Sequence, residues 1–188
     1  DLVLAIEVFE HLGDTAGAIS HHQKVLAADP GNLDSASALE RLQIIQSATS
    51  VALVGVSANI LRSSNFVATY LVRTDLEMYP VNPMYDEILG LKSYPSLADL
   101  PVVPDIVDVF RRHDELPNVV DEAIAVGAKV VWFQLGLRHD EAAAKASAAG
   151  LQVVQDRCLK IEHARFSGSL HLAGFNTGVI SSRRRRPI

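Results

Sequence analysis

The sequence predicts an α/β fold: a Rossmann-like, doubly wound parallel sheet of five strands, preceded by a helical hairpin. The first observation is a set of short segments that are apolar at nearly every position, as are strands buried on both faces of a sheet. The second is that these segments alternate with stretches of helical periodicity, which favours parallel strands joined by right-handed crossovers. We expect residues 1–33 to be helical, residues 34–166 to form the sheet domain and residues 167–188 to form an irregular tail.

The N-terminal segment is predicted to contain two helices separated by Gly13-Asp14, the second ending at the Asp-Pro-Gly-Asn of residues 29–32. The stretch GDTAGAISHHQKVLAADPGN resembles the second half of a tetratricopeptide repeat. A single repeat cannot bury its own apolar face, so a plain helical hairpin packed on the main domain is an equal alternative. The residues in register with the repeat are Gly13, Ala18, Ile19, Lys24, Leu26, Asp29 and Pro30.

The sheet domain begins with a helix expected over residues 34–46. The predicted strands follow as Val51–Val56, Glu77–Val81, Ile106–Phe110, Lys129–Leu135 and Gln152–Gln155. Helices are expected near Asn65–Arg73, Leu116–Val126 and Glu141–Ala149, with one helical turn starting at Ser96. In an open parallel sheet, ligands bind outside the carboxyl ends of the strands, where the strand order reverses.

The turn after the first predicted strand is a candidate phosphate-binding loop. Gly55 permits a tight turn, Ser57 offers a hydroxyl and a backbone N–H, and Arg62 and Ser64 add donors where the next helix begins. A helix start presents unpaired N–H groups and a positive dipole end to an anion. A single glycine is less than the dinucleotide fingerprint requires, so a purely structural turn remains open.

The end of the second predicted strand disfavours a dinucleotide. An NAD site needs an acid there to bind the ribose 2′-hydroxyl, but this chain has Asn82-Pro83. Asp86 and Glu87 come several residues too late. NAD or FAD therefore stays as the alternative ligand class.

A set of motifs in order along the chain resembles the small bacterial CoA-binding proteins, which share the CoA-binding domain of the succinyl-CoA synthetase α subunit. The motifs are Val-Gly-x-Ser, Pro-Val-Asn-Pro, Tyr-Pro-Ser-Leu, Val-Asp-Val-Phe-Arg-Arg, Gln-Leu-Gly and Asp-Arg-Cys-x-Lys-x-Glu-His, between about Ser47 and Arg165. The resemblance implies a strand order of 3-2-1-4-5 and coenzyme A at the switch point. This chain departs from the family at residues 58–61, where the family often has proline and glycine.

The resemblance assigns candidate CoA-binding residues to the strand ends. The first turn and the helix start would hold the pyrophosphate, and the second strand's end would form a wall near the adenosine diphosphate. Residues at the end of the third strand would bind adenine or phosphate. The glycine after the fourth strand would allow the ligand to approach the backbone closely. Each role has a structural alternative. Arg62 would be a solvated surface charge, Asn82-Pro83 a rigid exit from the second strand, and Gly136 an ordinary turn. The candidates are Gly55, Ser57, Arg62, Ser64, Asn82, Pro83, Phe110, Arg111, Gln134 and Gly136.

No catalytic or metal site is predicted. Cys158 lies near Arg157 and Lys160, which could favour a thiolate, and Glu162-His163 could act as an acid–base pair. A buried cysteine and a helix capped by Asp156 explain the same residues without chemistry. The histidines lack zinc-ligand spacing. We therefore expect a binding or sensing module, with an enzyme left open.

Composition limits the partners. The net charge is −5, and without the run Arg183–Arg186 the remainder is more acidic still, which disfavours nucleic acid as a partner. No segment is long enough to span a membrane, and the single cysteine favours the cytoplasm. A homo-oligomer or a protein partner bound through the N-terminal helices or the C-terminal tail remains possible, so an interaction scaffold is a further alternative.

Overall fold

A computed structural model describes residues 15–29 and 33–166. The helix expected in the first nine residues and the C-terminal tail, with its arginine run, lie outside the described residues. The described chain divides into two compact units: residues 15–29, 33–47 and 160–166 form the helical unit, and residues 48–159 form the sheet unit. The expected boundary at residue 33 does not coincide with this division, because the helix after it belongs to the helical unit.

The helical unit contains α2 (Thr15–Ala28), α3 (Leu33–Ser47) and nearly all of α7 (Leu159–Phe166). The second helix of the expected hairpin is present as α2, and the helix expected over residues 34–46 is present as α3. The hairpin itself and the tetratricopeptide resemblance stay predictions, because the first helix lies outside the described residues. Arg41 of α3 donates from Nε to Glu162 of α7 at 2.9 Å, and the Glu162 side chain is completely buried. A buried ion pair therefore joins helices far apart in the sequence.

The sheet unit contains a parallel five-stranded sheet in the order β2-β1-β5-β6-β7, as the α/β prediction requires. The strands are β1 (Ser50–Val54), β2 (Glu77–Val81), β5 (Ile106–Val109), β6 (Val130–Phe133) and β7 (Gln152–Val154). Each overlaps a predicted strand.

The strand order differs in detail from the expected 3-2-1-4-5. Counted along the chain, the observed order is 2-1-3-4-5, so the third strand pairs with the first and β2 lies at the edge. Pro80 in β2 gives a physical reason. Proline has no N–H for a ladder and is found on edge strands rather than in the middle of a sheet.

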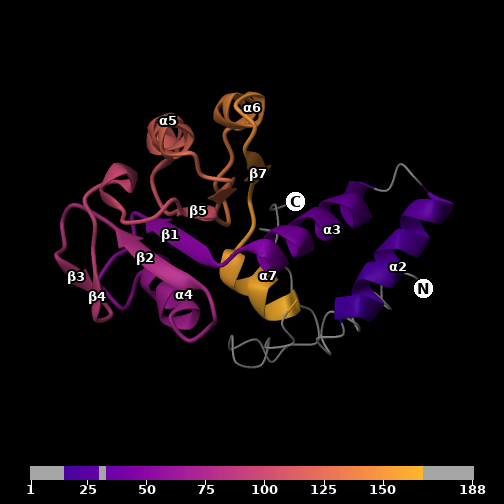
Figure 1. Cartoon of the computed structure of the whole chain (residues 1–188), viewed down its shortest axis with the longest axis horizontal. Helices are drawn as coiled ribbons and strands as arrows, with labels where there is room; N and C mark the ends of the chain where they lie inside the picture. The colour runs from indigo at the N-terminus through magenta and orange to yellow at the C-terminus, as the bar shows by residue number, and fades with distance from the viewer. Residues whose placement is uncertain (1–14, 30–32, 167–188) are drawn as a thin grey trace, which may run out of the picture. The chain divides into compact units, whose positions relative to one another are not determined.

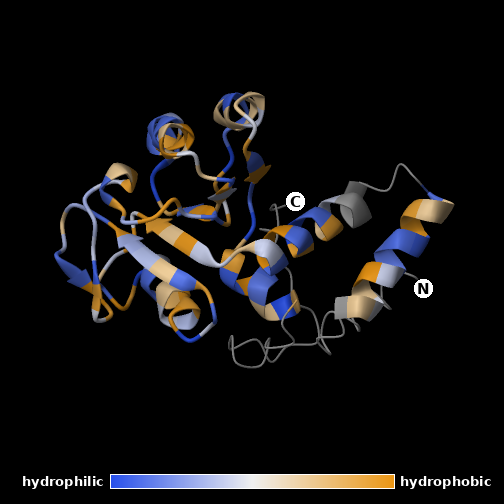
Figure 2. Cartoon of the chain, in the orientation of Figure 1, coloured by the Kyte–Doolittle hydropathy of each residue, from blue (hydrophilic) through white to orange (hydrophobic). Residues whose placement is uncertain are grey.

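Helices cover both faces of the sheet. Figure 1 shows α5 (Leu116–Val126) and α6 (Asp140–Ala148) on one side and α4 (Ser63–Leu71) on the other. Alternate strand residues such as Ala52, Val107 and Phe133 pack with α5 and α6 in one apolar core, and Figure 2 shows the hydrophobic colouring along β1. No helix in the described ranges is long and apolar enough to cross a membrane.

Short elements connect β2 to β5. They are the antiparallel pair β3 (Glu87–Ile88) and β4 (Leu91–Lys92) and the 3-10 turn η1 (Leu97–Asp99), and a second 3-10 turn, η2 (His113–Glu115), precedes α5. The helical turn expected at Ser96 is present, and Ser96 and Asp99 bond reciprocally as a capping box. The chain runs from β1 to β2 on one side and then to β5 on the other, so the order reverses between β1 and β5.

Candidate functional site

Gly55 stands where the carboxyl ends of β1 and β5 meet. Its φ is +86°, which favours glycine, and a Cβ at this position would lie 2.8 Å from the Phe110 carbonyl oxygen and 3.1 Å from Arg111 Cδ. The close neighbours that require glycine are thus residues of the protein itself. We define Gly55, Phe110 and Arg111 as the switch-point site.

The turn between β1 and α4 is braced by its own side chains. The Ser57 N–H donates to Ser64 Oγ at 3.2 Å, and the Asn65 amide donates to the Ser57 carbonyl at 2.9 Å. Ser57 Oγ in turn accepts from Asn59 N–H, and Asn59 Oδ1 accepts from Leu61 N–H. Ser57 and Ser64, both predicted to contact pyrophosphate, are therefore first of all groups that fix the shape of this turn.

Arg62 lies at the start of α4. It occupies the N-cap position, its side chain makes no capping hydrogen bond, and it is exposed. The first N–H groups of a helix have no partner within the helix, and the helix dipole adds positive potential there. Arg62 and the following Ser63 thus begin an electropositive helix end beside the turn.

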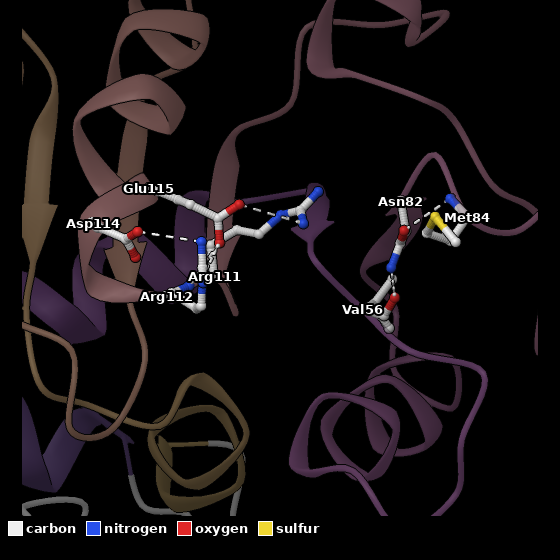
Figure 3. A network of polar contacts seen from close by, with 7 residues as sticks. All are labelled: Val56, Asn82, Met84, Arg111, Arg112, Asp114 and Glu115. Atoms are coloured by element: carbon white, nitrogen blue, oxygen red, sulfur yellow. Dashed lines mark hydrogen bonds and ion pairs between the residues drawn. The ribbon is translucent and has the colours of Figure 1, made fainter.

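Asn82 ties the end of β2 to the same turn. Its Nδ2 donates to the Val56 carbonyl at 2.7 Å, and its Oδ1 accepts from the Met84 N–H at 3.0 Å, as Figure 3 shows. The side chain is thereby committed to the backbone, and the residue is buried. The adjacent Pro83 is exposed. The position where an NAD site has its acid is consequently filled by a structural amide.

Two neighbouring arginines after β5 have different surroundings. Arg111 lies against Gly55 through its stem, and its guanidinium has one ion pair among the described residues, to Glu115 at 3.8 Å. Arg112 pairs with Asp114 at 3.2 Å and Glu115 at 3.4 Å and is 77% exposed. In Figure 3 the Arg111 side chain extends toward the side on which Asn82 is drawn. Arg111 is therefore the loosely held cation of the switch-point site.

Gln134 and Gly136 follow β6 and are held by acids. Gln134 Nε2 lies 2.8 Å from both carboxylate oxygens of the buried Asp108. The Gly136 N–H donates to Asp156 Oδ1 at 2.6 Å, and Gly136 has a φ of +84°. The expectation that Asp156 caps the last helix is wrong, because α7 begins three residues later at Leu159 and the carboxylate instead closes the turn after β6.

The structure brings together one group of predicted residues around the ends of β1, β2 and β5: Gly55, Ser57, Ser64, Asn82, Phe110 and Arg111. Arg62 and Pro83 are exposed beside them, and Gln134 and Gly136 lie one strand further along.

Sequence reasoning missed three residues. Asn65 anchors the first turn, Tyr85 Oη lies 3.4 Å from Ser57 Oγ, and Asp108 holds Gln134. Asp108 could have been found, because it is an acid inside an otherwise apolar strand.

Cys158 is half-buried, and within residues 15–29 and 33–166 no cluster of three or more histidine, cysteine or acidic side chains could hold a metal ion.

Comparisons with known proteins match a large part of the chain. A family model described as a CoA binding domain matches residues 49–164. The uncharacterized protein YneT of Bacillus subtilis is 37% identical over 132 residues, which are 70% of this chain and 98% of that protein. An ADP-forming acetate–CoA ligase of Methanocaldococcus jannaschii is 31% identical over 88 residues, or 47% of this chain and 12% of the ligase.

Among solved structures, a hypothetical protein from Pyrococcus horikoshii matches with a TM-score of 0.67 and 41% identity, over 69% of this chain and 91% of that one. A protein from Thermus thermophilus matches with a TM-score of 0.65 and 34% identity, over 69% and 98%. The match to the Bacillus subtilis protein and the matches to these two structures each cover about 70% of this chain.

Proposed function

The chain belongs to the CoA-binding domain family, and from that premise we propose that it binds coenzyme A or an acyl-CoA at the switch point between β1 and β5. We further propose that the protein is a binding or sensing module and catalyses no reaction by itself. The ligase relative supports a link to CoA chemistry, but this chain matches 12% of that enzyme, so the rest of the ligase has no counterpart in the match.

The observation that carries the proposal is that Arg111 lies at the switch point with only a weak ion pair to Glu115. Coenzyme A is rich in phosphate, and a guanidinium suits phosphate because its planar fork donates paired hydrogen bonds. Arg111 lies against the turn after β1, at the point where ligands bind in open parallel sheets. Its ion pair with Glu115 spans 3.8 Å, and both side chains are partly exposed. Exposed pairs of this kind contribute little, about 0–1 kcal/mol, so Arg111 is available to an anion.

Asn82 supports coenzyme A over NAD. Both Asn82 amide atoms bond to backbone groups of neighbouring turns. An amide held in this way cannot act as the carboxylate that binds the ribose diol of NAD. Coenzyme A carries a phosphate on its adenosine ribose, so a cationic site without that acid favours it.

The test is calorimetric titration of coenzyme A, dephospho-CoA and NAD into the protein and three variants. Arg111→Ala should lose about 1.5–3 kcal/mol of binding, or roughly ten- to a hundredfold in affinity for coenzyme A. Arg62→Ala should lose a similar amount if the start of α4 contributes to the same anion site. Both losses should shrink as salt is raised.

Arg112→Ala is the matched control, because this neighbouring arginine is exposed and already paired with two acids. We expect its affinity to stay within about threefold of the parent, less than 1 kcal/mol. If Arg111→Ala binds coenzyme A as tightly as Arg112→Ala at low salt, the switch-point site is not the phosphate site. Tighter binding of NAD than of coenzyme A would overturn the ligand class.

A further inference from the structure

Asp108 is an acid in the interior of the sheet. It lies in β5, in register with Leu53 of β1 and Trp132 of β6, and it has no exposed surface. Burial of a charged carboxylate costs several kcal/mol unless hydrogen bonds compensate for it. Strands buried on both faces normally carry apolar residues. An acid at this place therefore indicates a role beyond packing.

The partner of Asp108 is the amide of Gln134. Nε2 lies 2.8 Å from Oδ1 and 2.8 Å from Oδ2, and Nε2 is only a donor, so both oxygens act as acceptors. This arrangement belongs to the ionised carboxylate. It fixes the amide with its nitrogen toward Asp108. The amide oxygen Oε1 accepts no hydrogen bond from the residues that the structure describes.

Gln134 lies at the carboxyl ends of the strands, where the ligand is proposed to bind. It directly follows the last residue of β6, and β6 pairs with β5, whose end contributes Phe110 to the switch-point site. In a parallel sheet the carboxyl ends of neighbouring strands lie on the same side. The unoccupied acceptor is thus one strand away from Arg111.

We propose that Asp108 is a positioning residue, which orients Gln134 so that Oε1 accepts a hydrogen bond from an N–H group of the ligand. The inference rests on the proposed function, and the amide N–H groups in the pantetheine arm of coenzyme A are donors of this kind. Arg111 then binds phosphate, and Gln134 Oε1 accepts a hydrogen bond from the pantetheine arm, which leads to the thiol or acyl end.

Because Asp108 is titratable, this role predicts that the affinity for the ligand depends on pH. Burial raises the pKa of Asp108 to about 8, although hydrogen bonds from Gln134 and from the Val109 N–H oppose the rise. No charged side chain in the described part of the chain contributes, and the strand neighbours Leu53 and Trp132 are uncharged.

A protonated Asp108 is itself a donor and needs an acceptor. The amide of Gln134 must then turn its oxygen toward Asp108 and present Nε2, a donor, to the ligand. Binding of a ligand N–H therefore favours the ionised carboxylate, and below about pH 8 it releases a proton.

The experiment measures the affinity for dephospho-CoA by calorimetry from about pH 6 to about pH 8.5. This probe lacks the phosphate monoester that titrates near pH 6. Affinity of the parent protein should rise by up to roughly tenfold per pH unit below the pKa of Asp108. Asp108→Asn is neutral throughout and nearly equal in size, so its affinity should not follow this rise. The stacked rings of His113 and His139 are present in both proteins, so the difference between the two proteins isolates Asp108.

Gln134→Leu is the second variant, in case Asp108→Asn does not fold by circular dichroism. It removes the acceptor and should lose the same pH dependence, with weaker binding at the alkaline end. A variant that keeps the pH dependence of the parent, or a parent whose affinity is flat across this range, would overturn the positioning role. A parent that binds no dephospho-CoA or coenzyme A at any pH would instead refute the proposed function.

Discussion

Gly55→Ala tests the close approach between the ends of β1 and β5. The new methyl group would lie 2.8 Å from the Phe110 carbonyl oxygen, closer than real Cβ atoms come to such an atom, and 3.1 Å from Arg111 Cδ. The arginine stem can move, but the carbonyl belongs to the backbone just after a fully buried strand. We therefore expect the end of β5 or the turn after β1 to shift.

The expected cost has two parts. A non-glycine residue at a φ of +86° costs about 1–2 kcal/mol. The collision adds about 1–3 kcal/mol, as overpacking does in a dense interior. The sum is about 2–5 kcal/mol, less a few tenths because alanine restricts the unfolded chain. This is a large part of the stability of an ordinary domain, about 5–15 kcal/mol.

Urea unfolding measured by the fluorescence of Trp132 is a suitable assay, because Trp132 is the single tryptophan and lies fully buried in β6. Gly127→Ala and Gly150→Ala are matched controls. These glycines have φ values of +77° and +93°, but a Cβ at either meets nothing within 4 Å. Each control should lose only the backbone part, about 1–2 kcal/mol. A loss for Gly55→Ala equal to that of the controls would refute the close-approach argument.

Two further predictions concern stability. Burial alone would raise the pKa of Asp105, but hydrogen bonds from Lys129 and Thr49 outweigh it and hold that pKa well below its usual value. A depressed carboxyl pKa contributes stability above the unfolded value of about 3.9 and loses it as pH falls, so Asp105→Asn should flatten the melting temperature between about pH 5 and pH 3. An unchanged slope would contradict this. Arg41→Met should destabilise the helical unit by about 3–5 kcal/mol, because it removes a cation from the buried carboxylate of Glu162. Arg41→Met with Glu162→Gln should recover part of that loss in urea unfolding, and strictly additive costs would argue against coupling.

The elements of the sheet unit could be predicted because their signals are local. A strand buried on both faces is apolar at nearly every position, and the segment Ile106–Val109 keeps this pattern despite Asp108. The helix over Leu116–Val126 has the predicted bounds, with proline in its first turn and Gly127 in a left-handed cap. Periodicity and caps act within a few residues, so they can be read from the chain.

The strand order could not be predicted in the same way. Whether the third strand pairs with β1 or with β2 depends on backbone partners that, for β1 and β5, are 55 residues apart in the sequence, and both arrangements bury the same apolar segments. Pro80 was a local hint that β2 lies at the edge. The resemblance to a family led to the right fold but to the wrong detail of its order.

The sequence by itself therefore determined the α/β class, the positions of the strands and the family, because these depend on local periodicity and on motifs in order. Only the tertiary structure decided which polar side chains meet. Arg111 and Arg112 are adjacent and chemically identical, yet one lies against Gly55 and the other pairs with surface acids. Asp108 and Gln134 are 26 residues apart and join because their strands are neighbours. Side-chain chemistry is written in the sequence, but hydrogen bonds and ion pairs act over a few ångströms, and the fold sets those distances.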